Sequence, residues 1–370
     1  MAQRLAVIAA GGTGGHLFPA QALAEVLKAR GWRIVLATDE RVAGMSDTFP
    51  AEEQVGLPAA TLSLGNPVKA VPALFTLLRG LLKGRAMLSR LNPDIVVGFG
   101  GYPSLPALMA AVSQGRKSVI HEQNAVMGRA NRLVASRVTA IGCAFPTLQK
   151  APESVKARAV VMGNPIRPEI RALYDQPYVK PTPNGEICLL VTGGSQGARL
   201  LSELVPAAVA KLPEALRDRL TVMQQARKES MEGARQTYLN AGVKAEVAPF
   251  FRDMASRLAK AHLVIGRGGA GTVCEFAVAG RPAILVPLQI ALDDDQGQNA
   301  LLMAEAGGAV VAREHELTLA SMTKALELLL GDPDKLEKMA AASHSVGKPD
   351  AAERLADLVE RAAGAQALLK

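Results

Sequence analysis

The chain has 370 residues, of which 49% are hydrophobic, 21% charged and 4% aromatic, and its formal net charge is +8. This length exceeds one ordinary hydrophobic core and predicts about two domains, and the composition excludes general disorder. A positive charge can indicate nucleic-acid binding, but the few aromatic residues and the lack of a basic motif interleaved with them disfavour that function. We therefore expect no nucleic-acid partner.

Several features of the chain predict a cytoplasmic protein. The N-terminus carries only Arg4 before a short apolar run and lacks the pattern of a signal peptide. No segment approaches the length of a membrane span. The cysteines Cys143, Cys188 and Cys274 are far apart and not in Cys-x-x-Cys spacing, which favours a reducing compartment over disulfides or a zinc site.

The first half of the chain alternates short apolar runs with helical ones. Strands are predicted at residues 5–10, 33–37, 94–98, 118–121 and 138–142. This pattern is typical of a parallel sheet with right-handed crossovers. Ligands of such sheets bind beyond the carboxyl ends of the strands.

A glycine-rich turn, Gly11-Gly12-Thr13-Gly14-Gly15-His16, follows the first predicted strand and precedes a helical run. Backbone N–H groups and a helix N-terminus at such a turn favour anions, most often phosphates. The turn lacks both the spacing of a dinucleotide-binding fingerprint and the Lys-Ser/Thr pair of a P-loop, which disfavours ATP hydrolysis. The alternative is that the glycines serve only close packing of strand and helix.

Residues 54–93 contain no acidic side chain. The basic residues of this stretch are Lys69, Arg79, Lys83, Arg85 and Arg90. On a helical wheel of residues 72–91, most of the large apolar side chains share one side, and Arg85 is the only basic side chain inside that arc. These apolar residues are Leu74, Phe75, Leu77, Leu78, Leu81, Leu82 and Leu88. The pattern fits a helix on an anionic membrane surface and equally a helix packed on its own sheet with a solvated basic face.

The run His121-Glu122-Gln123-Asn124 comes at the end of the fourth predicted strand. Four polar side chains at the carboxyl edge of a sheet indicate a functional site, because core residues are not expected there. The alternative is a turn whose polar groups cap the following helix.

A break at residues 162–165 and a proline-rich passage up to residue 185 separate the two halves. Strands are then predicted at 186–192, 220–223, 244–248, 262–266 and 282–287, and the stretch from Asp350 is expected to form a helix that returns to the first domain. The predicted domains are therefore 1–163 together with 345–370, and 164–344.

The second half repeats the glycine turn as Gly193-Gly194-Ser195-Gln196-Gly197-Ala198. A third turn, residues 266–275, places Glu275 one turn inside the next predicted helix, where its carboxylate could accept both hydrogen bonds of a ribose diol. An acid near a helix N-terminus is alternatively explained by the helix dipole. The run Asp293-Asp294-Asp295 matches no calcium-loop spacing and is interpreted as a solvated acidic turn.

Six segments in this order resemble the MurG family, peripheral membrane glycosyltransferases that add N-acetylglucosamine to lipid I in bacterial cell-wall synthesis. They are residues 11–20, 100–104, 121–124, 163–167, 193–198 and 267–275. The match covers nearly the whole chain. The resemblance implies an α/β fold of GT-B glycosyltransferase architecture, in which two Rossmann-like parallel-sheet domains face an interdomain cleft.

The resemblance also implies that the C-terminal domain binds UDP-N-acetylglucosamine. Phe251 is expected against the uracil, Glu275 on the ribose and Ser195 near the diphosphate. Gln296 and Asn299 are expected on the sugar hydroxyls, and N-terminal residues complete the donor site on closure. The expected donor contacts are Thr13, Gly14, Gly15, Asn124, Arg167, Ser195, Gln196, Phe251, Ala270, Gly271, Thr272, Glu275, Gln296 and Asn299.

The acceptor is implied to face His16, Tyr102, Glu122 and Asn131 of the N-terminal domain. In the implied reaction, the C4 hydroxyl of the N-acetylmuramyl-pentapeptide displaces UDP with inversion, which gives lipid II. His16 is the first candidate for the general base because imidazole titrates near neutrality, and Glu122 is the second. A histidine at this place could instead only bind phosphate. Helix N-termini and Arg167 can stabilise the departing diphosphate, so no obligatory cofactor or metal is expected.

Because lipid I carries an undecaprenyl tail, the resemblance implies a peripheral protein on the cytoplasmic face of the bacterial inner membrane, bound to anionic lipid through residues 69–91. Cell-wall synthesis and division proteins are further partners that it allows. Three alternatives stay open: another GT-B transferase that uses a UDP-sugar, a nicotinamide oxidoreductase, and a non-catalytic scaffold that binds nucleotide sugars.

Overall fold

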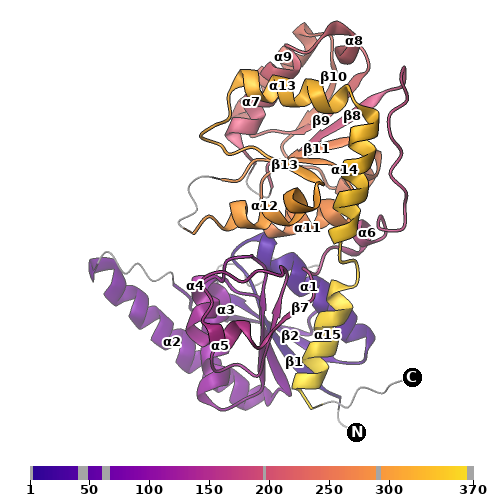
Figure 1. Cartoon of the computed structure of the whole chain (residues 1–370). Helices are drawn as coiled ribbons and strands as arrows, with labels where there is room; N and C mark the ends of the chain where they lie inside the picture. Colours follow the sequence, from indigo (N-terminus) through magenta and orange to yellow (C-terminus); the bar gives the residue numbers. More distant parts are fainter. Residues whose placement is uncertain (1–2, 41–48, 61–66, 195–196, 289–292, 365–370) are drawn as a thin grey trace. The chain divides into compact units, whose positions relative to one another are not determined.

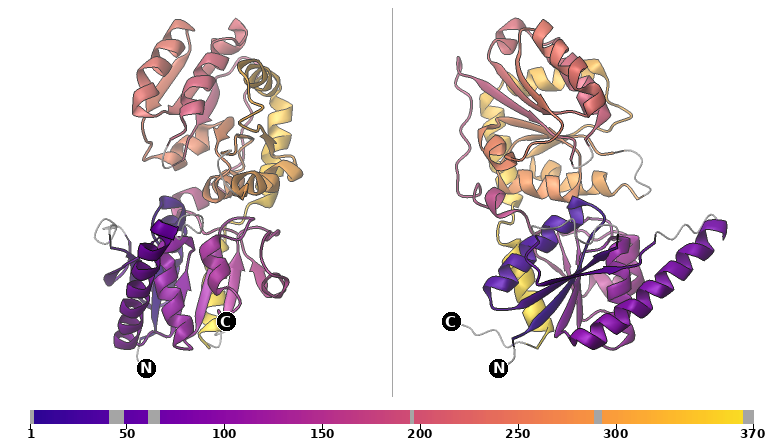
Figure 2. Two further views of the ribbon diagram at one scale, coloured as in Figure 1. Left: turned by 90° about the vertical axis from the view of Figure 1, so that its left-hand side faces the viewer. Right: turned by 180° about the vertical axis from the view of Figure 1, so that it is seen from behind.

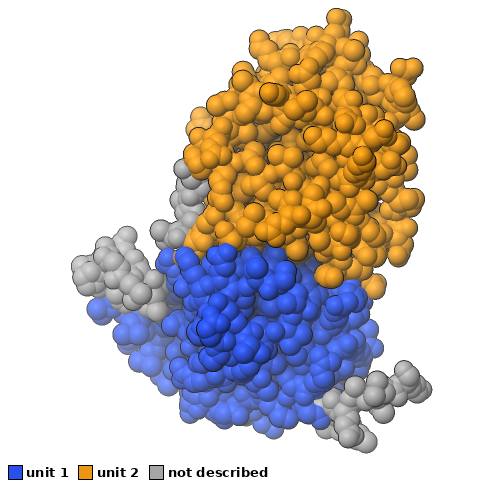
Figure 3. All heavy atoms as spheres, in the orientation of Figure 1, with its two compact units in different colours: residues 1–167, 350–370 blue, residues 168–349 orange. Residues whose placement is uncertain are grey.

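The structure is a computed structural model that describes residues 3–40, 49–60, 67–194, 197–288 and 293–364 (Figure 1). The chain forms two compact units, unit 1 with residues 1–167 and 350–370, and unit 2 with residues 168–349 (Figure 3). These boundaries lie within a few residues of those predicted. Each unit is built on one parallel sheet with helices on both faces (Figure 2).

The sheet of unit 1 has the strand order β3-β2-β1-β4-β5-β6-β7, and all its pairs are parallel. The strands are β1 (Leu5–Ala9), β2 (Arg33–Asp39), β3 (Glu53–Leu57), β4 (Ile95–Gly98), β5 (Ser118–Glu122), β6 (Ala140–Cys143) and β7 (Ala159–Val161). The order reverses between β1 and β4. The carboxyl ends of these two strands therefore form the switch point at which parallel sheets bind ligands.

The helices of unit 1 cover the two faces of its sheet. They are α1 (Gly14–Ala29), α2 (Pro67–Leu91), α3 (Gly101–Ser113), α4 (Arg129–Val134), α5 (Glu153–Lys156) and α15 (Ala351–Ala362). Alternate residues of β1 face opposite sides, so Ile8 packs with α1 and α15, whereas Val7 packs with α2, α3 and α4. Both faces of the central strand are thus buried.

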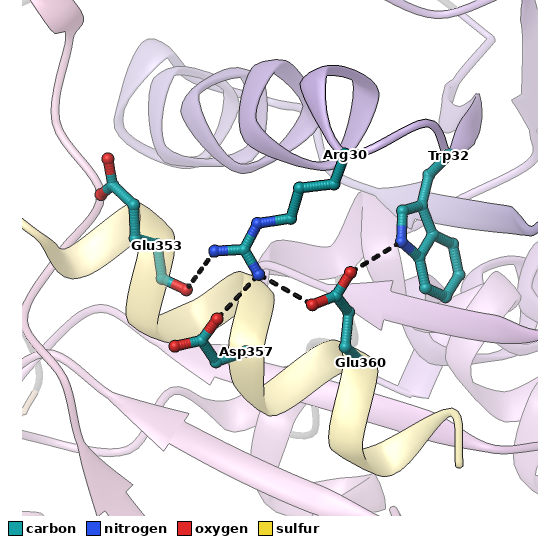
Figure 4. A network of polar contacts seen from close by, with 5 residues as sticks. All are labelled: Arg30, Trp32, Glu353, Asp357 and Glu360. Carbon is teal, nitrogen blue, oxygen red and sulfur yellow. Dashed lines mark hydrogen bonds and ion pairs between the residues drawn. The ribbon is translucent and has the colours of Figure 1, made fainter. Parts of the chain in front are cut away.

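The C-terminal helix α15 is joined to unit 1 by a polar network at the end of α1 (Figure 4). The Nη1 atom of Arg30 lies 2.7 Å from a carboxylate oxygen of Asp357 and 2.8 Å from one of Glu360. The Trp32 indole donates a hydrogen bond of 3.1 Å to the same Glu360. Because Leu355 and other apolar side chains of α15 are buried in this unit as well, the final helix belongs to unit 1.

The sheet of unit 2 has the order β10-β9-β8-β11-β12-β13, again all parallel, and it reverses between β8 and β11. Its strands are β8 (Ile187–Val191), β9 (Leu220–Gln225), β10 (Lys244–Ala248), β11 (Leu263–Gly266), β12 (Ala283–Leu285) and β13 (Ala309–Val311). Its helices are α6 (Pro168–Arg171), α7 (Arg199–Val209), α8 (Glu214–Arg217), η1 (Lys228–Ser230), α9 (Met231–Asn240), α10 (Met254–Lys260), α11 (Ala270–Val278), α12 (Asp295–Ala306), α13 (Leu319–Leu330) and α14 (Pro333–Val346).

The long helix α2 divides the apolar arc that the sequence predicted. Leu77 and Leu88 are buried, and Gly84 lets α2 approach α3 closely, because a Cβ there would lie 3.1 Å from the backbone oxygen of Pro106. Leu74, Phe75, Leu78 and Leu82 are instead at least half exposed. One part of the arc therefore packs on unit 1 and the other faces outward. Among the described residues, no helix is both long and apolar enough to cross a membrane.

Candidate active site

The glycine turn of unit 1 lies at its switch point, where β1 leads into α1. Thr13 is the N-cap of α1 and has extended backbone angles, but its side chain makes no capping hydrogen bond. The first turn of α1 contains no acidic residue, and Thr13 and Gly15 are exposed. The N–H groups and positive dipole end of α1 are therefore suited to an anion.

His16 lies in the first turn of α1, and its ring is oriented by the carbonyl group of Phe99. The Nδ1 atom is 2.9 Å from the Phe99 oxygen and 2.8 Å from the Gln123 side-chain nitrogen. Because the carbonyl oxygen can only accept, we assign the proton to Nδ1. Gln123 donates to the same oxygen at 2.6 Å. Burial lowers the pKa of His16 below its usual 6.5, partly offset by the hydrogen bond to Phe99. The ring is therefore neutral at pH 7, with Nε2 as its basic nitrogen.

Glu122 is the last residue of β5 and is buried. Its carboxylate accepts hydrogen bonds from the backbone of Asn124 (3.0 Å) and Gly128 (2.9 Å) and from the side chain of Asn131 (2.8 Å). Burial raises the pKa of Glu122, and these hydrogen bonds oppose that shift. The contacts indicate that Glu122 and Asn131 order the segment between β5 and α4.

His121 is a core residue, although core residues were not expected at this edge of the sheet. Its ring is fully buried, and Nε2 lies 3.0 Å from the backbone oxygen of Gly163. Burial lowers the pKa of His121 to about 4, so the ring is neutral. It joins β5 to the segment after β7, which is a structural role.

Two further residues predicted for unit 1, Tyr102 and Arg167, lie on α3 and at the end of the first segment of this unit. Tyr102 is in the first turn of α3 and is half-buried against the core. The Arg167 guanidinium lies 5.4 Å from the ring centroid of Phe18 in α1, so its positive charge is near the helix that follows the glycine turn. His16, Tyr102, Glu122 and Asn131 therefore all come from elements at the carboxyl edge of this sheet.

In unit 2, the second glycine turn lies between β8 and α7, at the corresponding switch point. Gln225, the last residue of β9, accepts from the Gly193 backbone at 3.2 Å and donates to the Gly194 oxygen at 3.0 Å. Gln225 was not among the site residues predicted from the sequence, although it is a polar residue at a strand end. Ser195 and Gln196, which were predicted to bind the donor, lie outside the described residues.

The predicted ribose loop leads into α11, whose N-cap Gly269 has no side chain to cap it. Ala270, Gly271 and Thr272 form its uncapped first turn, and Glu275 follows, half-buried. This helix end also suits an anion or a polar ligand.

Two residues expected on the donor sugar hold the loops in place. Asn299 is fully buried and donates a 3.1 Å hydrogen bond to the backbone oxygen of Gly268. The side-chain oxygen of Gln296 accepts from the Leu288 backbone at 3.0 Å. Asn299 thus acts on the loop before α11, and a direct contact with a sugar is not favoured by its burial.

The aromatic residue predicted against uracil is buried. Phe251 has 3% of its surface exposed, and the Arg257 guanidinium covers its ring at 3.8 Å from the centroid. The preceding residue, Phe250, is 56% exposed. Phe250 is therefore the ring that is accessible for stacking on a base. The sequence alone does not show which of the two neighbouring phenylalanines is exposed.

The acidic run at the start of α12 forms an ion pair. Asp294 lies 2.9 Å from the Arg313 guanidinium. Within the parts of the chain that the structure describes, no group of three or more His, Cys, Asp and Glu side chains has a metal-binding arrangement.

Two parallel sheets, each with a glycine turn and an uncapped helix N-terminus at its switch point, are typical of proteins that bind phosphorylated ligands. The chain belongs to glycosyltransferase family 28: the N-terminal domain model of this family matches residues 6–143 and the C-terminal domain model matches residues 188–355. It is accordingly a glycosyltransferase.

Full-length relatives carry one and the same name. A protein of Phenylobacterium zucineum is 66% identical over 361 residues, which cover 98% of this chain and 99% of that protein. A protein of Caulobacter vibrioides is 62% identical over 360 residues, covering 97% and 99%. Both are named UDP-N-acetylglucosamine--N-acetylmuramyl-(pentapeptide) pyrophosphoryl-undecaprenol N-acetylglucosamine transferase.

Solved structures agree with the fold. The crystal structure of MurG from Acinetobacter baumannii has a TM-score of 0.78 and 28% identity and covers 97% of this chain and 99% of that one. The calicheamicin glycosyltransferase CalG4 has a TM-score of 0.65 at 19% identity, covering 99% and 100%, and supports the fold alone. The GT-B class predicted from the resemblance is confirmed.

Proposed function

We propose that this chain transfers N-acetylglucosamine from UDP-N-acetylglucosamine to the C4 hydroxyl of the N-acetylmuramyl-pentapeptide carried by pyrophosphoryl-undecaprenol. The observation that carries the proposal is the 66% identity over nearly the whole length to a relative named for this transfer. The neutral, oriented imidazole of His16 supports a catalytic protein over a scaffold that only binds nucleotide sugars.

The chemistry is a single displacement. The acceptor oxygen attacks the anomeric carbon of the donor while its proton passes to Nε2 of His16, and the bond to the diphosphate breaks with its electron pair leaving on UDP. The Phe99 carbonyl holds the Nδ1 proton and favours the imidazolium that forms, because a charged donor strengthens that hydrogen bond. Attack opposite the leaving group gives an inverted, β-linked product.

Unit 2 provides the donor contacts in this proposal. The uncapped starts of α7 and α11 offer backbone N–H groups to the diphosphate and ribose. Glu275 accepts from the ribose hydroxyls, and Phe250 stacks on the uracil. In unit 1, Thr13, Gly14 and Gly15 at the start of α1 add N–H donors, and Arg167 adds charge.

We propose that these groups stabilise the leaving diphosphate without an obligatory metal. The positive ends of α1 and α11 and the guanidinium of Arg167 supply the potential that a divalent ion would otherwise provide. The test is the transfer rate after treatment with EDTA. An unchanged rate is expected, and a loss that Mg²⁺ restores would overturn this part of the proposal.

A membrane surface on α2 completes the proposal, because the acceptor is lipid-linked. Leu74, Phe75, Leu78 and Leu82 project from this helix, and Leu74 and Leu78 also line an apolar cavity of about 370 Å³ with side chains of α3 and α4. Arg79 on the same helix is exposed and adds attraction to anionic lipid. We propose a peripheral position on the cytoplasmic face of the bacterial inner membrane.

The activity is tested by UDP release from UDP-N-acetylglucosamine with and without a lipid I analogue in detergent. Release that depends on the acceptor, together with a β-1,4-linked disaccharide product, is the expected result. UDP release with a different lipid only would mean that the chain is a transferase with another acceptor. Donor binding without turnover on any acceptor would favour the scaffold, and oxidation of a reduced nicotinamide cofactor would favour the oxidoreductase.

A further inference from the structure

Two adjacent residues after β13, Arg313 and Glu314, hold the two loops of unit 2 that lead into α11 and α12. Arg313 Nη1 lies 2.9 and 3.1 Å from the two carboxylate oxygens of Asp294. Glu314 receives two hydrogen bonds from Arg267, at 3.2 and 3.3 Å. One dipeptide thus makes a double contact with each loop.

The first contact fixes the loop before α11. Arg267 directly follows β11, is buried, and also donates to the Val286 oxygen at 3.2 Å. A buried guanidinium needs a carboxylate partner, and the two nitrogens and two oxygens here form a paired arrangement that fixes orientation as well as position. Glu314 therefore determines where Gly268, Gly269 and the start of α11 lie.

The second contact fixes the start of α12. Asp294, the N-cap of α12, has a left-handed backbone with φ of 51° and ψ of 32°, a conformation that Asp adopts more readily than most residues with a side chain. Arg313 contacts both of its carboxylate oxygens, in a partly exposed ion pair, and so favours one placement of this N-cap. Arg313 therefore contributes to the position of the first turn of α12, which carries Gln296.

The two loops are also in direct contact. Asn299 in α12 donates to the Gly268 oxygen at 3.1 Å, and Gly268 has no room for a Cβ because the Gln296 backbone oxygen is there. The two loops therefore meet at Gly268, and each has its own second support in Glu314 or Arg313.

We propose that Arg313 and Glu314 are positioning residues of the donor site: Glu314 sets the α11 end for the nucleotide, and Arg313 sets the α12 end for the sugar. The inference rests on the proposed function for the identity of the ligand. Neither residue needs to touch the donor, since each acts through a loop that the proposed function places at the donor.

The test measures the affinities for UDP and for UDP-N-acetylglucosamine by calorimetry, together with KM and kcat for transfer. Glu314→Gln is expected to weaken both ligands alike, by about tenfold, the equivalent of one charge-assisted hydrogen bond. Arg313→Gln is expected to leave UDP affinity within about twofold and to raise the KM for UDP-N-acetylglucosamine about tenfold, with little change in kcat.

Conservative variants and a matched control separate positioning from folding. Arg313→Lys and Glu314→Asp keep the charges and should recover most of the lost affinity. Lys180→Ala breaks the exposed ion pair of Lys180 with Asp334 in the same unit and should leave both affinities unchanged. The proposal would be overturned by an unchanged UDP affinity in Glu314→Gln together with an unchanged KM for UDP-N-acetylglucosamine in Arg313→Gln. Equal losses in Lys180→Ala would also overturn it.

The proposed function fails separately. If the wild-type protein binds UDP but transfers no N-acetylglucosamine, the acceptor or the activity is wrong, and the UDP affinity of Glu314→Gln still decides the role of Glu314. If the wild-type protein binds neither UDP nor the donor, both proposals are overturned.

Discussion

The imidazole of His16 and the backbone carbonyl of Phe99 form a 2.9 Å hydrogen bond in which Nδ1 is assigned as the donor. Phe99 directly follows β4, and His16 is in the first turn of α1, so the bond links the two elements at the switch point of unit 1. A Cβ on Gly101 would lie 3.2 Å from the His16 Nε2 atom, so the glycine keeps the surroundings of that nitrogen open.

Replacement of His16 by alanine should abolish most of the transfer activity and leave nucleotide binding intact. General base catalysis contributes a factor of about 10² to 10⁴, and we expect kcat to fall by that amount while UDP affinity changes by less than about twofold. The control is Lys28→Ala, an exposed residue on the same helix. Transfer that persists in His16→Ala would remove His16 from the mechanism.

The pH dependence of kcat/KM should place the acid limb below pH 6.5. Burial lowers the pKa of His16, so the ring stays unprotonated as the pH falls through 6.5 and can still accept a proton. The enzyme loses activity only at lower pH, when the ring is protonated. The measurement is kcat/KM between pH 5 and 8 with the donor saturating. A limb above pH 6.5 would mean that a different group titrates.

The variant Glu122→Gln should lose stability, because an amide nitrogen would face donors that now bind carboxylate oxygen. We expect a loss of about 1–3 kcal/mol in the free energy of unfolding, measured with urea. Glu153→Gln, at an exposed position of the same unit, should have little effect. Full stability with lost transfer in Glu122→Gln would instead make Glu122 the catalytic base.

Alanine variants of Phe250 and Phe251 should have different effects, the first on UDP binding and the second on the free energy of unfolding. Phe250→Ala is expected to weaken UDP binding by about tenfold, because an exposed ring contributes stacking, with no change in stability. Phe251→Ala should cost about 3–5 kcal/mol of unfolding free energy, because the ring is buried. UDP titrations and urea unfolding of both variants check this, and the reverse outcome would restore Phe251 as the stacking residue.

The outward face of α2 should bind anionic vesicles. Phe75→Glu is expected to reduce binding of the protein in co-sedimentation with phosphatidylglycerol-containing vesicles, and added salt should weaken binding by the wild type. Leu239→Glu makes the same change at an exposed apolar residue of unit 2 and serves as the control. Equal losses in the two variants would show that α2 is not the membrane surface.

The sequence by itself determined the architecture, because the central strands and the glycine turns leave strong local signals. The central strands β1 and β8 were predicted at residues 5–10 and 186–192, within one residue at each end, and both switch-point turns lie where their glycines indicated. Continuous apolar runs arise when both faces of a strand are buried, as for β1, and such runs are visible without a structure.

Three strands, β3, β7 and β13, were not predicted, and all are at sheet edges with partly exposed residues. An edge strand pairs on one side only and is less buried, so its residues need no continuous apolar run. Their presence depends on the neighbouring strand, and their local sequence gave no signal, whereas the fourth edge strand, β10, was predicted with its full bounds.

The roles of individual side chains were decided by tertiary structure. Phe250 and Phe251 are identical neighbours, yet only packing beneath Arg257 buries the second. Asn299 and Glu122 have the residue types of a binding site, but their polar atoms are bound to loops that only the fold brings near them. The type and order of residues determine which elements form, whereas burial and hydrogen-bond partners depend on contacts between distant segments.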